Sequence, residues 1–228
     1  INLNNAKYFA GHSLGEYSAL SCAGYLNFSD TIKLLRTRGD AMQNAVPKGE
    51  GGMVAILGST IEVIENILKE NQKNFDVQIA NDNSIGQIVL SGKNKDLELL
   101  MSDLKSKSIK NIKLPVSAPF HCKLMNQATK IMKSELDKTK FNDSSNILIS
   151  NVTAKEIFDK ENLKNLLVDQ VENRVRWRES VNYMIQNGVK HFIEIGPGKV
   201  LSGLIKRINK DVKINSINSE IDIKELNI

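Results

Sequence analysis

The sequence predicts an α/β fold in which helices cover a mostly parallel sheet and a smaller unit is inserted into the larger one. Two observations carry this prediction. Segments with strand character alternate with segments of helical periodicity along most of the 228 residues, and such alternation is typical of parallel sheets. Between residues 48 and 115 the order changes, and the length of the chain allows one large domain with an insert.

The first segment combines a strand, a tight turn and a helix. Residues 6–10 form a short apolar run, residues 11–15 read Gly-His-Ser-Leu-Gly, and the helical pattern that follows continues to Gly24. Glycine can end a helix there because it readily adopts a positive φ. A second helix is predicted from capping residue types at 29–30 to a stop at 46–47.

From Lys48 onward the order is strand, helix, strand, strand, helix, strand. The strands are predicted over 53–57, 77–81, 87–90 and 111–114, and the helices over 61–70 and 95–107. This order is that of the split βαβ, or ferredoxin-like, motif. We therefore expect residues 48–115 to form an inserted subdomain, and residues 1–47 and 116–228 to form the core around it.

After the insert, strands and helices alternate again. A loop over 116–120 leads to a helix over 121–138, and the remaining chain predicts strands over 146–151, 191–195 and 212–217 and helices over 161–171, 177–187 and 200–209. Strands of this kind, separated by helices, favour the parallel arrangement of the core.

Composition excludes several classes of protein. Hydrophobic residues at 41% and charged residues at 25% are ordinary globular values. No run of about 18 apolar residues is present and the first residues lack a secretory pattern, so we expect a cytoplasmic protein that does not enter a membrane. Cys22 and Cys122 have no C-x-x-C spacing, which indicates neither a disulfide framework nor a metal site.

The net charge of +5 indicates little about nucleic acid. Basic residues are scattered, apart from Arg174, Arg176 and Arg178 around Trp177, and no recognition motif accompanies them. We therefore expect no nucleic-acid binding, and a mildly basic surface suits an acidic protein partner.

The turn Gly11-x-Ser13-x-Gly15 matches a nucleophile elbow, in which a serine sits on a strained turn between a strand and a helix. The flanking glycines are expected because side chains there would clash with neighbouring backbone. In this geometry the N–H of Leu14 points at an oxyanion formed beside Ser13. A glycine-rich turn without catalytic function is the alternative.

A serine nucleophile needs a base, and the chain has three histidines. His12 adjoins the serine and His191 lies in an apparent buried strand, so both are expected to be structural. His121 follows a loop and opens the predicted helix, whose N-terminus would keep the ring neutral. No acidic residue is singled out as its partner, and a main-chain carbonyl could orient the ring instead. A purely structural helix-start role for His121 remains open.

Arg38 and Met42 are spaced i, i+4 on one apolar helix face. An arginine on such a face either extends its head group to solvent or pairs with an anion. If the face overlooks Ser13, the guanidinium could hold a substrate carboxylate through two hydrogen bonds.

Six stretches of the chain share a pattern with one enzyme family: GHSLGEYSAL at 11–20, RGDAMQNAVP at 38–47, NDNSIGQIVLSG at 81–92, LPVSAPFHCKLM at 114–125, VRWRESVNYM at 175–184 and IEIGPGKVLSGL at 193–204. Together they resemble the malonyl-CoA:acyl carrier protein transacylases, the acyltransferase family of fatty-acid and polyketide synthesis. The resemblance implies an α/β-hydrolase-like core with a ferredoxin-like insert.

The resemblance also implies roles for individual residues. Ser13 would be the acylated nucleophile, His121 the base, and Arg38 the clamp on the malonyl carboxylate. Gln170 matches the position whose backbone carbonyl orients the histidine, and Leu14 matches an oxyanion donor. Met42, Asn81 and Asn83 match the pocket wall.

The reaction implied is transfer of malonyl from malonyl-CoA to the pantetheine thiol of acyl carrier protein in fatty-acid biosynthesis. Malonyl-CoA is then a substrate, no cofactor is required, and acyl carrier protein is the partner of what we expect to be a monomer. The basic residues Lys199, Lys206, Arg207 and Lys210 could contact the carrier or form a solvated helix face.

The chain departs from the family at its front, where relatives carry a strand and a Gly-Gln-Gly loop with a second oxyanion donor. We therefore expect this chain to lack an N-terminal segment and to be inactive without that segment. Two other functions stay open: a serine esterase or thioesterase, in which water accepts the acyl group, and a non-catalytic module that docks a carrier protein.

Overall fold

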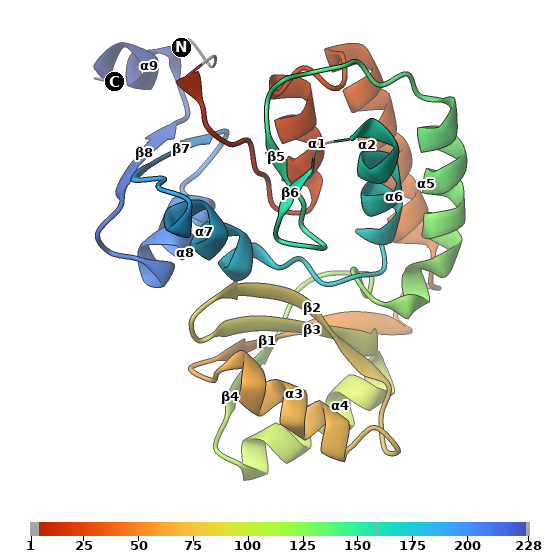
Figure 1. The fold of residues 1–228 in the computed structure, drawn as a ribbon. Coiled ribbons are helices and arrows are strands. Elements are labelled where there is room, and N and C mark those ends of the chain that lie inside the picture. Colours follow the sequence, from red (N-terminus) through yellow and green to blue (C-terminus); the bar gives the residue numbers. More distant parts are fainter. Residues whose placement is uncertain (1–4, 158, 227–228) are drawn as a thin grey trace.

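The computed structural model describes residues 5–157 and 159–226, and Figure 1 shows their arrangement. The helices are α1 (Leu14–Cys22), α2 (Phe28–Asn44), α3 (Ile61–Glu70), α4 (Asn94–Ser106), α5 (Asn126–Lys138), α6 (Lys160–Asp169), α7 (Trp177–Gln186), α8 (Val200–Ile208) and α9 (Glu220–Glu225). The strands are β1 (Gly51–Leu57), β2 (Val77–Ser84), β3 (Gln87–Lys93), β4 (Lys110–Lys113), β5 (Leu148–Ile149), β6 (Glu156–Ile157), β7 (His191–Ile195) and β8 (Lys213–Ile217).

The largest sheet is antiparallel and has the strand order β2-β3-β1-β4, with α3 and α4 packed on one face (Figure 1). Side chains alternate between its two faces, as the pleat of a strand requires. Val54 and Ile56 of β1 pack with the two helices, whereas Met53 and Val89 face Phe120 of the polypeptide outside this sheet. The sheet therefore has an apolar contact on each side.

The prediction of a mostly parallel sheet is wrong for the part of the chain that the structure describes. Parallel pairing is limited to β7 with β8 and to isolated bridges that join Phe9 to Leu148 and Asn81 to Val175. The chain turns directly after β5, where the Ser150 hydroxyl accepts a hydrogen bond from the Val152 N–H. Because of this turn, β5 pairs antiparallel with β6 and does not continue into a longer parallel ladder.

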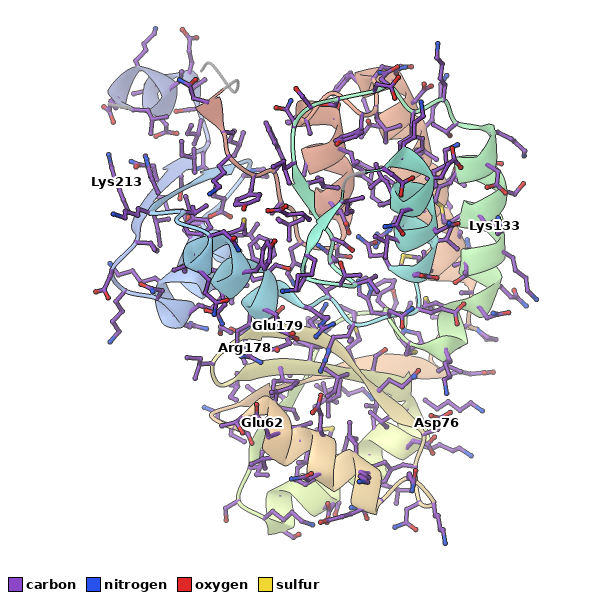
Figure 2. The ribbon with its side chains drawn as sticks, viewed as in Figure 1. Glu62, Asp76, Lys133, Arg178, Glu179 and Lys213 are labelled. Carbon is purple, nitrogen blue, oxygen red and sulfur yellow. The ribbon has the colours of Figure 1, made fainter. Side chains whose placement is uncertain are left out.

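Two helical layers complete the molecule. Helices α1, α2, α5 and α6 surround one apolar core that contains Tyr17, Leu20 and Met132, while α7 and α8 pack with β7 and β8 around Trp177. Figure 2 shows Lys133 on the outer side of α5, away from this core. Among the described residues, every helix is too short or too polar to cross a membrane.

Several element boundaries differ from the prediction. Helix α2 begins at Phe28 because the Asn27 side chain, not Ser29 or Asp30, caps it and accepts the Asp30 N–H at 2.8 Å. His121 does not open a helix, since its φ is 59° and α5 starts only at Asn126. Neither β6 nor α9 was expected from the sequence pattern.

Candidate active site

The candidate site is built around the turn that carries Ser13. Ser13 has φ 54° and ψ −106°, a conformation that L-residues rarely adopt. A Cβ at Gly11 would overlap the backbone carbonyl of Gly15, so only glycine fits at this position. The same reason does not hold for Gly15, because a Cβ there meets no described atom within 4 Å.

Asn151 holds this turn from the carboxyl side of β5. Its Oδ1 accepts the Ser13 N–H at 2.7 Å, and its Nδ2 donates to the Gly11 carbonyl at 2.7 Å. The side chain is fully enclosed and thus links both ends of the elbow. Sequence reasoning missed Asn151, although its place at the end of a predicted strand was a usable signal.

Leu14 is the first residue of α1, directly after the serine. Its N–H is one of the first-turn donors that find no acceptor inside a helix. Its side chain is 54% exposed. The position of the backbone N–H is therefore suited to an oxyanion that forms at Ser13, whereas the side chain is not part of the core.

Ser13 and His121 lie within hydrogen-bond distance, with 2.7 Å between Oγ and Nε2. The other ring nitrogen, Nδ1, is 2.8 Å from the backbone carbonyl oxygen of Gln170. A carbonyl can only accept, so Nδ1 carries the proton and Nε2 is free to accept the proton of Ser13. The Ser13 hydroxyl, the His121 ring and the Gln170 main-chain carbonyl are thus connected by successive hydrogen bonds.

The pKa of His121 is lowered to about 3, first by burial and second by the nearby Arg38 guanidinium. The ring is therefore neutral at pH 7 and able to take a proton. This corrects the predicted cause: the ring is neutral because it is buried, not because it lies at a helix N-terminus.

Arg38 points from α2 toward Ser13 and is only 6% exposed. Its Nη2 donates to Ser13 Oγ at 2.9 Å and to Gln170 Oε1 at 2.9 Å. Its Nε is buried and has no acceptor among the described residues. The guanidinium head thus does not extend to solvent, and part of its donor edge is available for an anion beside the serine.

A buried carboxylate lies behind the serine turn. Glu16 is fully buried, and burial raises the pKa of its carboxyl to about 7. Its Oε2 accepts from Gln170 Nε2 at 2.5 Å and its Oε1 accepts the Asn151 N–H at 3.2 Å. Sequence reasoning missed Glu16; its signal was a charged residue on the buried side of a helix, three positions after Ser13.

The three residues expected in the pocket wall, Asn83, Met42 and Asn81, have different surroundings in the structure. Asn83 Oδ1 lies 2.7 Å from His12 Nε2, next to the serine turn. Met42 is buried in the apolar core of the helical layer, and Asn81 is held through its backbone bridge to Val175. Within the part of the chain that the structure describes, these contacts of Met42 and Asn81 do not reach Ser13.

His12 and His191 both have partners away from the serine hydroxyl. His12 is buried, which lowers the pKa of its ring, and it packs against Trp177 at 5.8 Å between ring centroids. His191 Nε2 lies 2.8 Å from Asn215 Oδ1 between β7 and β8. The expectation that His121, of the three, lies against the serine is therefore met by the geometry.

An open pocket of about 310 Å³ lies beside His121. It is lined by Glu65, Leu68, Gln78, Ile79, His121, Glu172, Asn173 and Arg174. These residues come from α3, β2, the loop between β4 and α5 and the loop after α6, on both sides of the boundary between the antiparallel sheet and the rest of the chain. The pocket gives one route of access toward the histidine.

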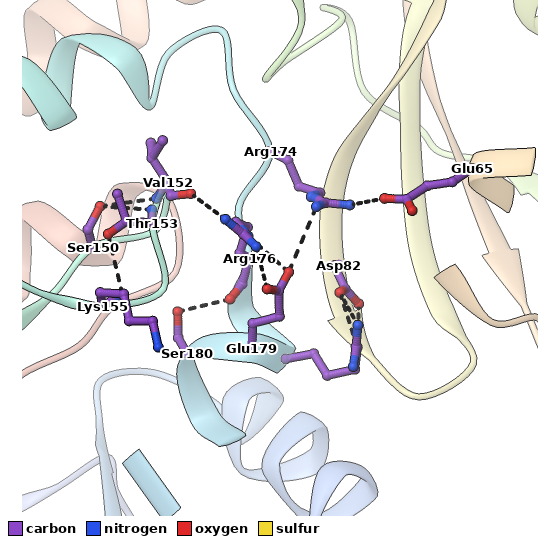
Figure 3. A network of polar contacts seen from close by, with 11 residues as sticks. Glu65, Asp82, Ser150, Val152, Thr153, Lys155, Arg174, Arg176, Glu179 and Ser180 are labelled. Atoms are coloured by element: carbon purple, nitrogen blue, oxygen red, sulfur yellow. Dashed lines mark hydrogen bonds and ion pairs between the residues drawn. The ribbon is translucent and has the colours of Figure 1, made fainter. Parts of the chain in front are cut away.

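The three arginines around Trp177 are engaged in ion pairs (Figure 3). Arg174 Nη1 lies 2.8 Å from Glu65 Oε1, Arg176 Nη2 lies 2.5 Å from Glu179 Oε2, and Arg178 Nη2 lies 2.8 Å from Asp82 Oδ2. Figure 2 places Arg178 and Glu179 at the junction of α7 with the antiparallel sheet. The cluster therefore joins two parts of the molecule and does not present free cations to a polyanion.

Comparison with known proteins identifies the family. A family model described as the acyl transferase domain matches residues 4–221. The chain belongs to the acyl transferase domain family. This acyltransferase is 45% identical over 213 residues to the malonyl CoA-acyl carrier protein transacylase of Bacillus subtilis (strain 168), covering 92% of this chain and 67% of that protein.

A second relative of the acyltransferase, the malonyl CoA-acyl carrier protein transacylase of Staphylococcus aureus (strain MRSA252), is 41% identical over 98% of this chain and 73% of its own length. Among solved structures, the acyl-carrier-protein-S-malonyltransferase from Bartonella henselae has a TM-score of 0.95 at 44% identity, covering 99% of this chain and 72% of that chain.

A second structural match is a type II polyketide acyl-carrier protein in complex with its malonyl-transacylase. It has a TM-score of 0.91 at 38% identity and covers 96% of this chain and 71% of that chain. The resemblance to the malonyl-transacylase family inferred from the six sequence stretches is thereby confirmed.

Proposed function

We propose that the acyltransferase moves a malonyl group from malonyl-CoA to the pantetheine thiol of acyl carrier protein in fatty-acid biosynthesis. One structural observation supports this proposal independently of the names of the relatives. Arg38 places Nη2 2.9 Å from Ser13 Oγ, and its buried Nε has no acceptor within residues 5–157 and 159–226. A cation in this position suits an acyl group that ends in a carboxylate.

In the first half-reaction Ser13 Oγ attacks the thioester carbonyl of malonyl-CoA while His121 Nε2 takes the serine proton. The N–H of Leu14 donates to the oxyanion of the tetrahedral intermediate. The carbon–sulfur bond then breaks, CoA thiolate leaves, and His121 returns the proton to its sulfur. The product is a malonyl ester on Ser13.

In the second half-reaction the pantetheine thiol of the carrier gives its proton to His121 and attacks the same ester carbonyl. The carbon–oxygen bond to Ser13 breaks, and the proton passes to Oγ. The Gln170 carbonyl keeps Nδ1 protonated during both halves, at 2.8 Å. A main-chain acceptor can do this without a third charged residue, in line with the lack of an acidic partner for His121.

Arg38 accounts for selectivity in this scheme. A malonyl carboxylate replaces water around the guanidinium with charge-assisted hydrogen bonds, whereas an acetyl group leaves buried N–H donors unpaired, a penalty of about 1–3 kcal/mol. Asn83, Asn81 and Met42 are proposed to line the pocket around the acyl group, with Asn83 the nearest to the serine turn through His12.

Further parts of the proposal rest on the family pattern. We propose an α/β-hydrolase-like core over residues 1–47 and 116–228, with a ferredoxin-like insert over residues 48–115 that holds β1–β4, α3 and α4. Acyl carrier protein is the proposed partner. A monomeric state, the cytoplasmic location and the lack of a cofactor stay predictions.

The test is intact-protein mass spectrometry after the full-length protein is mixed with malonyl-CoA, with Ser13→Ala as the matched control. We expect one malonyl adduct on the wild-type chain and none on the variant. Transfer of that adduct to pantetheine-loaded acyl carrier protein should follow. Absence of an adduct, or an adduct that persists in Ser13→Ala, contradicts the proposed mechanism.

The same experiment separates the two alternatives. A serine hydrolase transfers the acyl group to water without labelling the carrier, and a hydrolase of neutral esters has no need of an arginine beside the serine. A docking module binds the carrier while Ser13 stays unmodified. Arg38→Ala should remove the preference for malonyl over acetyl under the transferase proposal alone.

A further inference from the structure

Glu16 is a buried acid that the proposed reaction does not use. It lies on α1, one turn behind Ser13, and is fully enclosed. An ionised carboxylate in such a place is unfavourable unless several donors satisfy it. Here the donors are the Gln170 side-chain amide and the Asn151 backbone N–H, both of which also touch the serine turn or its partners.

The contacts form a chain from Glu16 to the substrate clamp. Gln170 Nε2 donates to Glu16 Oε2 at 2.5 Å, and Gln170 Oε1 accepts from Arg38 Nη2 at 2.9 Å. An amide has one donating end and one accepting end, whereas a carboxylate only accepts. Ionised Glu16, together with the Ser13 backbone carbonyl that Nε2 also reaches at 3.0 Å, therefore fixes the donating end of the Gln170 amide, so that its carbonyl end faces Arg38.

We propose that Glu16 is a positioning residue that sets the specificity of the enzyme for acyl groups with a free carboxylate, by orienting the Gln170 amide so that it holds Arg38. The inference rests on the proposed malonyl transfer and deepens it. Glu16 touches neither substrate nor reacting atoms; it acts through Gln170 on the guanidinium.

The side chain between the charged groups of Glu16 and Arg38 is the neutral amide of Gln170, and this affects how Arg38 can bind the substrate. A carboxylate in direct contact with Arg38 would occupy the guanidinium in bidentate fashion and compete with the substrate. The Gln170 amide accepts from Nη2 alone, and Nε has no acceptor among the residues that the structure describes. Arg38 is thus held in place while donors remain for the carboxylate of the acyl group.

The histidine depends on Gln170 through a separate contact. His121 Nδ1 faces the backbone carbonyl of Gln170, and the Gln170 backbone is fixed at the end of α6, where its N–H donates to the Leu166 carbonyl at 2.9 Å. A change in the side-chain amide therefore alters its contacts with Arg38 and with the Ser13 carbonyl, which it reaches at 3.0 Å, and leaves the backbone acceptor of His121 in place. This separation makes the proposal measurable.

The decisive variant is Glu16→Gln, which keeps the size of the side chain. Whichever way the new amide turns, its NH₂ group faces a donor, either Gln170 Nε2 or the Asn151 N–H. Malonyl-CoA and acetyl-CoA are compared by the rate of Ser13 acylation, followed by mass spectrometry. We expect kcat/KM for malonyl-CoA to fall by about ten- to a hundredfold, and that for acetyl-CoA to change by less than about threefold.

Asp96→Asn is the matched control. Asp96 is also a buried acid on a helix, and its Oδ2 accepts the Asp76 N–H at 3.3 Å, but it lies in α4 against the antiparallel sheet. Its removal should leave the ratio of malonyl to acetyl acylation unchanged. An equal loss for both acyl groups in Glu16→Gln, or no loss, would overturn the inference.

A double variant covers the case in which Glu16→Gln does not fold. In Glu16→Gln with Gln170→Glu, the new amide donates to the new carboxylate and accepts from Asn151, so both contacts of position 16 are restored. The carboxylate now contacts Arg38 directly and should abolish the malonyl preference while acetyl transfer persists. Retention of the wild-type ratio would refute the role of the amide. Acylation of the wild-type protein is measured before any variant is tested. Failure of the wild-type protein to acquire malonyl at Ser13 would contradict the proposed function itself.

Discussion

At the scale of the residue, the serine turn depends on one glycine more than on the other. Gly11 sits where any Cβ would overlap the Gly15 carbonyl, while Gly15 faces open space among the described atoms. The common GxSxG pattern thus has two different physical causes in this chain. Gly11 is required by close approach, and Gly15 is a helical residue of α1.

We expect Gly11→Ala to destabilise the protein by about 1–3 kcal/mol, since the turn must open to admit the methyl group. The shift of Ser13 away from His121 should also abolish acylation. Gly15→Ala is the control and should be neutral or stabilising by up to about 1 kcal/mol, because alanine favours a helix. Urea denaturation of both variants measures the difference, and equal losses would contradict the assignment.

The buried His121 also predicts how stability responds to pH. Its pKa is lowered to about 3 in the folded protein from its ordinary value of 6.5, so the unfolded chain binds more protons between these values. Its contribution to stability is therefore complete above about pH 6.5 and is lost as the pH falls toward 3.

We expect His121→Gln to lose less stability than the wild type when the pH is lowered from 6.5 to 4.5. Glu16 titrates in the opposite direction, since the pKa of its carboxyl is raised to about 7, but it is present in both proteins. Urea unfolding at several pH values gives the two slopes. Identical slopes would show that burial of the ring does not govern this dependence.

At the scale of the element, strand β2 is attached to α7 by one ion pair with a buried partner. The Asp82 side chain is 1% exposed, and Arg178 donates to both of its oxygens at 2.8 to 3.1 Å. The neighbouring residue Asn83 contacts His12 beside the serine turn. The pair thus helps to keep β2 against the site.

We expect Arg178→Met to destabilise the protein by about 2–4 kcal/mol, because Asp82 then remains buried without its cation. The control is Arg36→Met, which removes an exposed i, i+4 pair with Asp40 and should change stability by less than about 0.5 kcal/mol. Thermal unfolding followed by circular dichroism compares the two. A similar small effect in both would contradict the importance of this contact.

Sequence patterns predicted those elements whose signal is local. The helix over 61–70 and the strand over 191–195 have the expected bounds. The helix buries Ile61, Ile64 and Ile67 at helical spacing, and the strand is a short, mostly half-buried run. The strand over 146–151 is reduced to Leu148–Ile149, since the chain turns after Ile149 to pair with the nearby β6, and its other partner, Phe9, forms an isolated bridge from far along the chain. Long-range pairing is not encoded in the periodicity of one segment.

The same division applies to the candidate site. Ser13, His121 and Arg38 could be named from their local contexts, and the structure brings them together. Glu16 and Asn151 were not named, because a charge on the buried side of a helix and a residue at a strand end acquire a role only through their contacts across the chain. Such residues become visible only when the turn of Ser13 and the end of β5 are seen side by side.

At the scale of the whole molecule, the antiparallel sheet and the remaining chain share backbone and side-chain contacts. The Val175 N–H donates to the Ala80 carbonyl at 2.8 Å, and the Asp82 N–H donates to the Val175 carbonyl at 3.0 Å. The second face of the sheet packs against Phe120. These contacts favour cooperative unfolding of both parts.

We therefore expect circular dichroism and the fluorescence of Trp177 to report one transition. Trp177 is the only tryptophan of the sequence and lies outside the antiparallel sheet. Leu100→Ala, in the core between that sheet and its helices, should lower stability by about 2–5 kcal/mol and shift both signals equally. A fluorescence midpoint that stays at the wild-type value would show that the two parts unfold independently.

Gln170 contacts both the histidine and the arginine of the site, and this affects attempts to redesign the acyl preference. Its backbone faces the base and its side chain faces the arginine, so one residue at the end of α6 sets both reactivity and choice of acyl group. Insertions or deletions between α6 and Val175 would displace both contacts together. Engineering a new substrate range is therefore better directed at side chains around Arg38 than at the length of this loop.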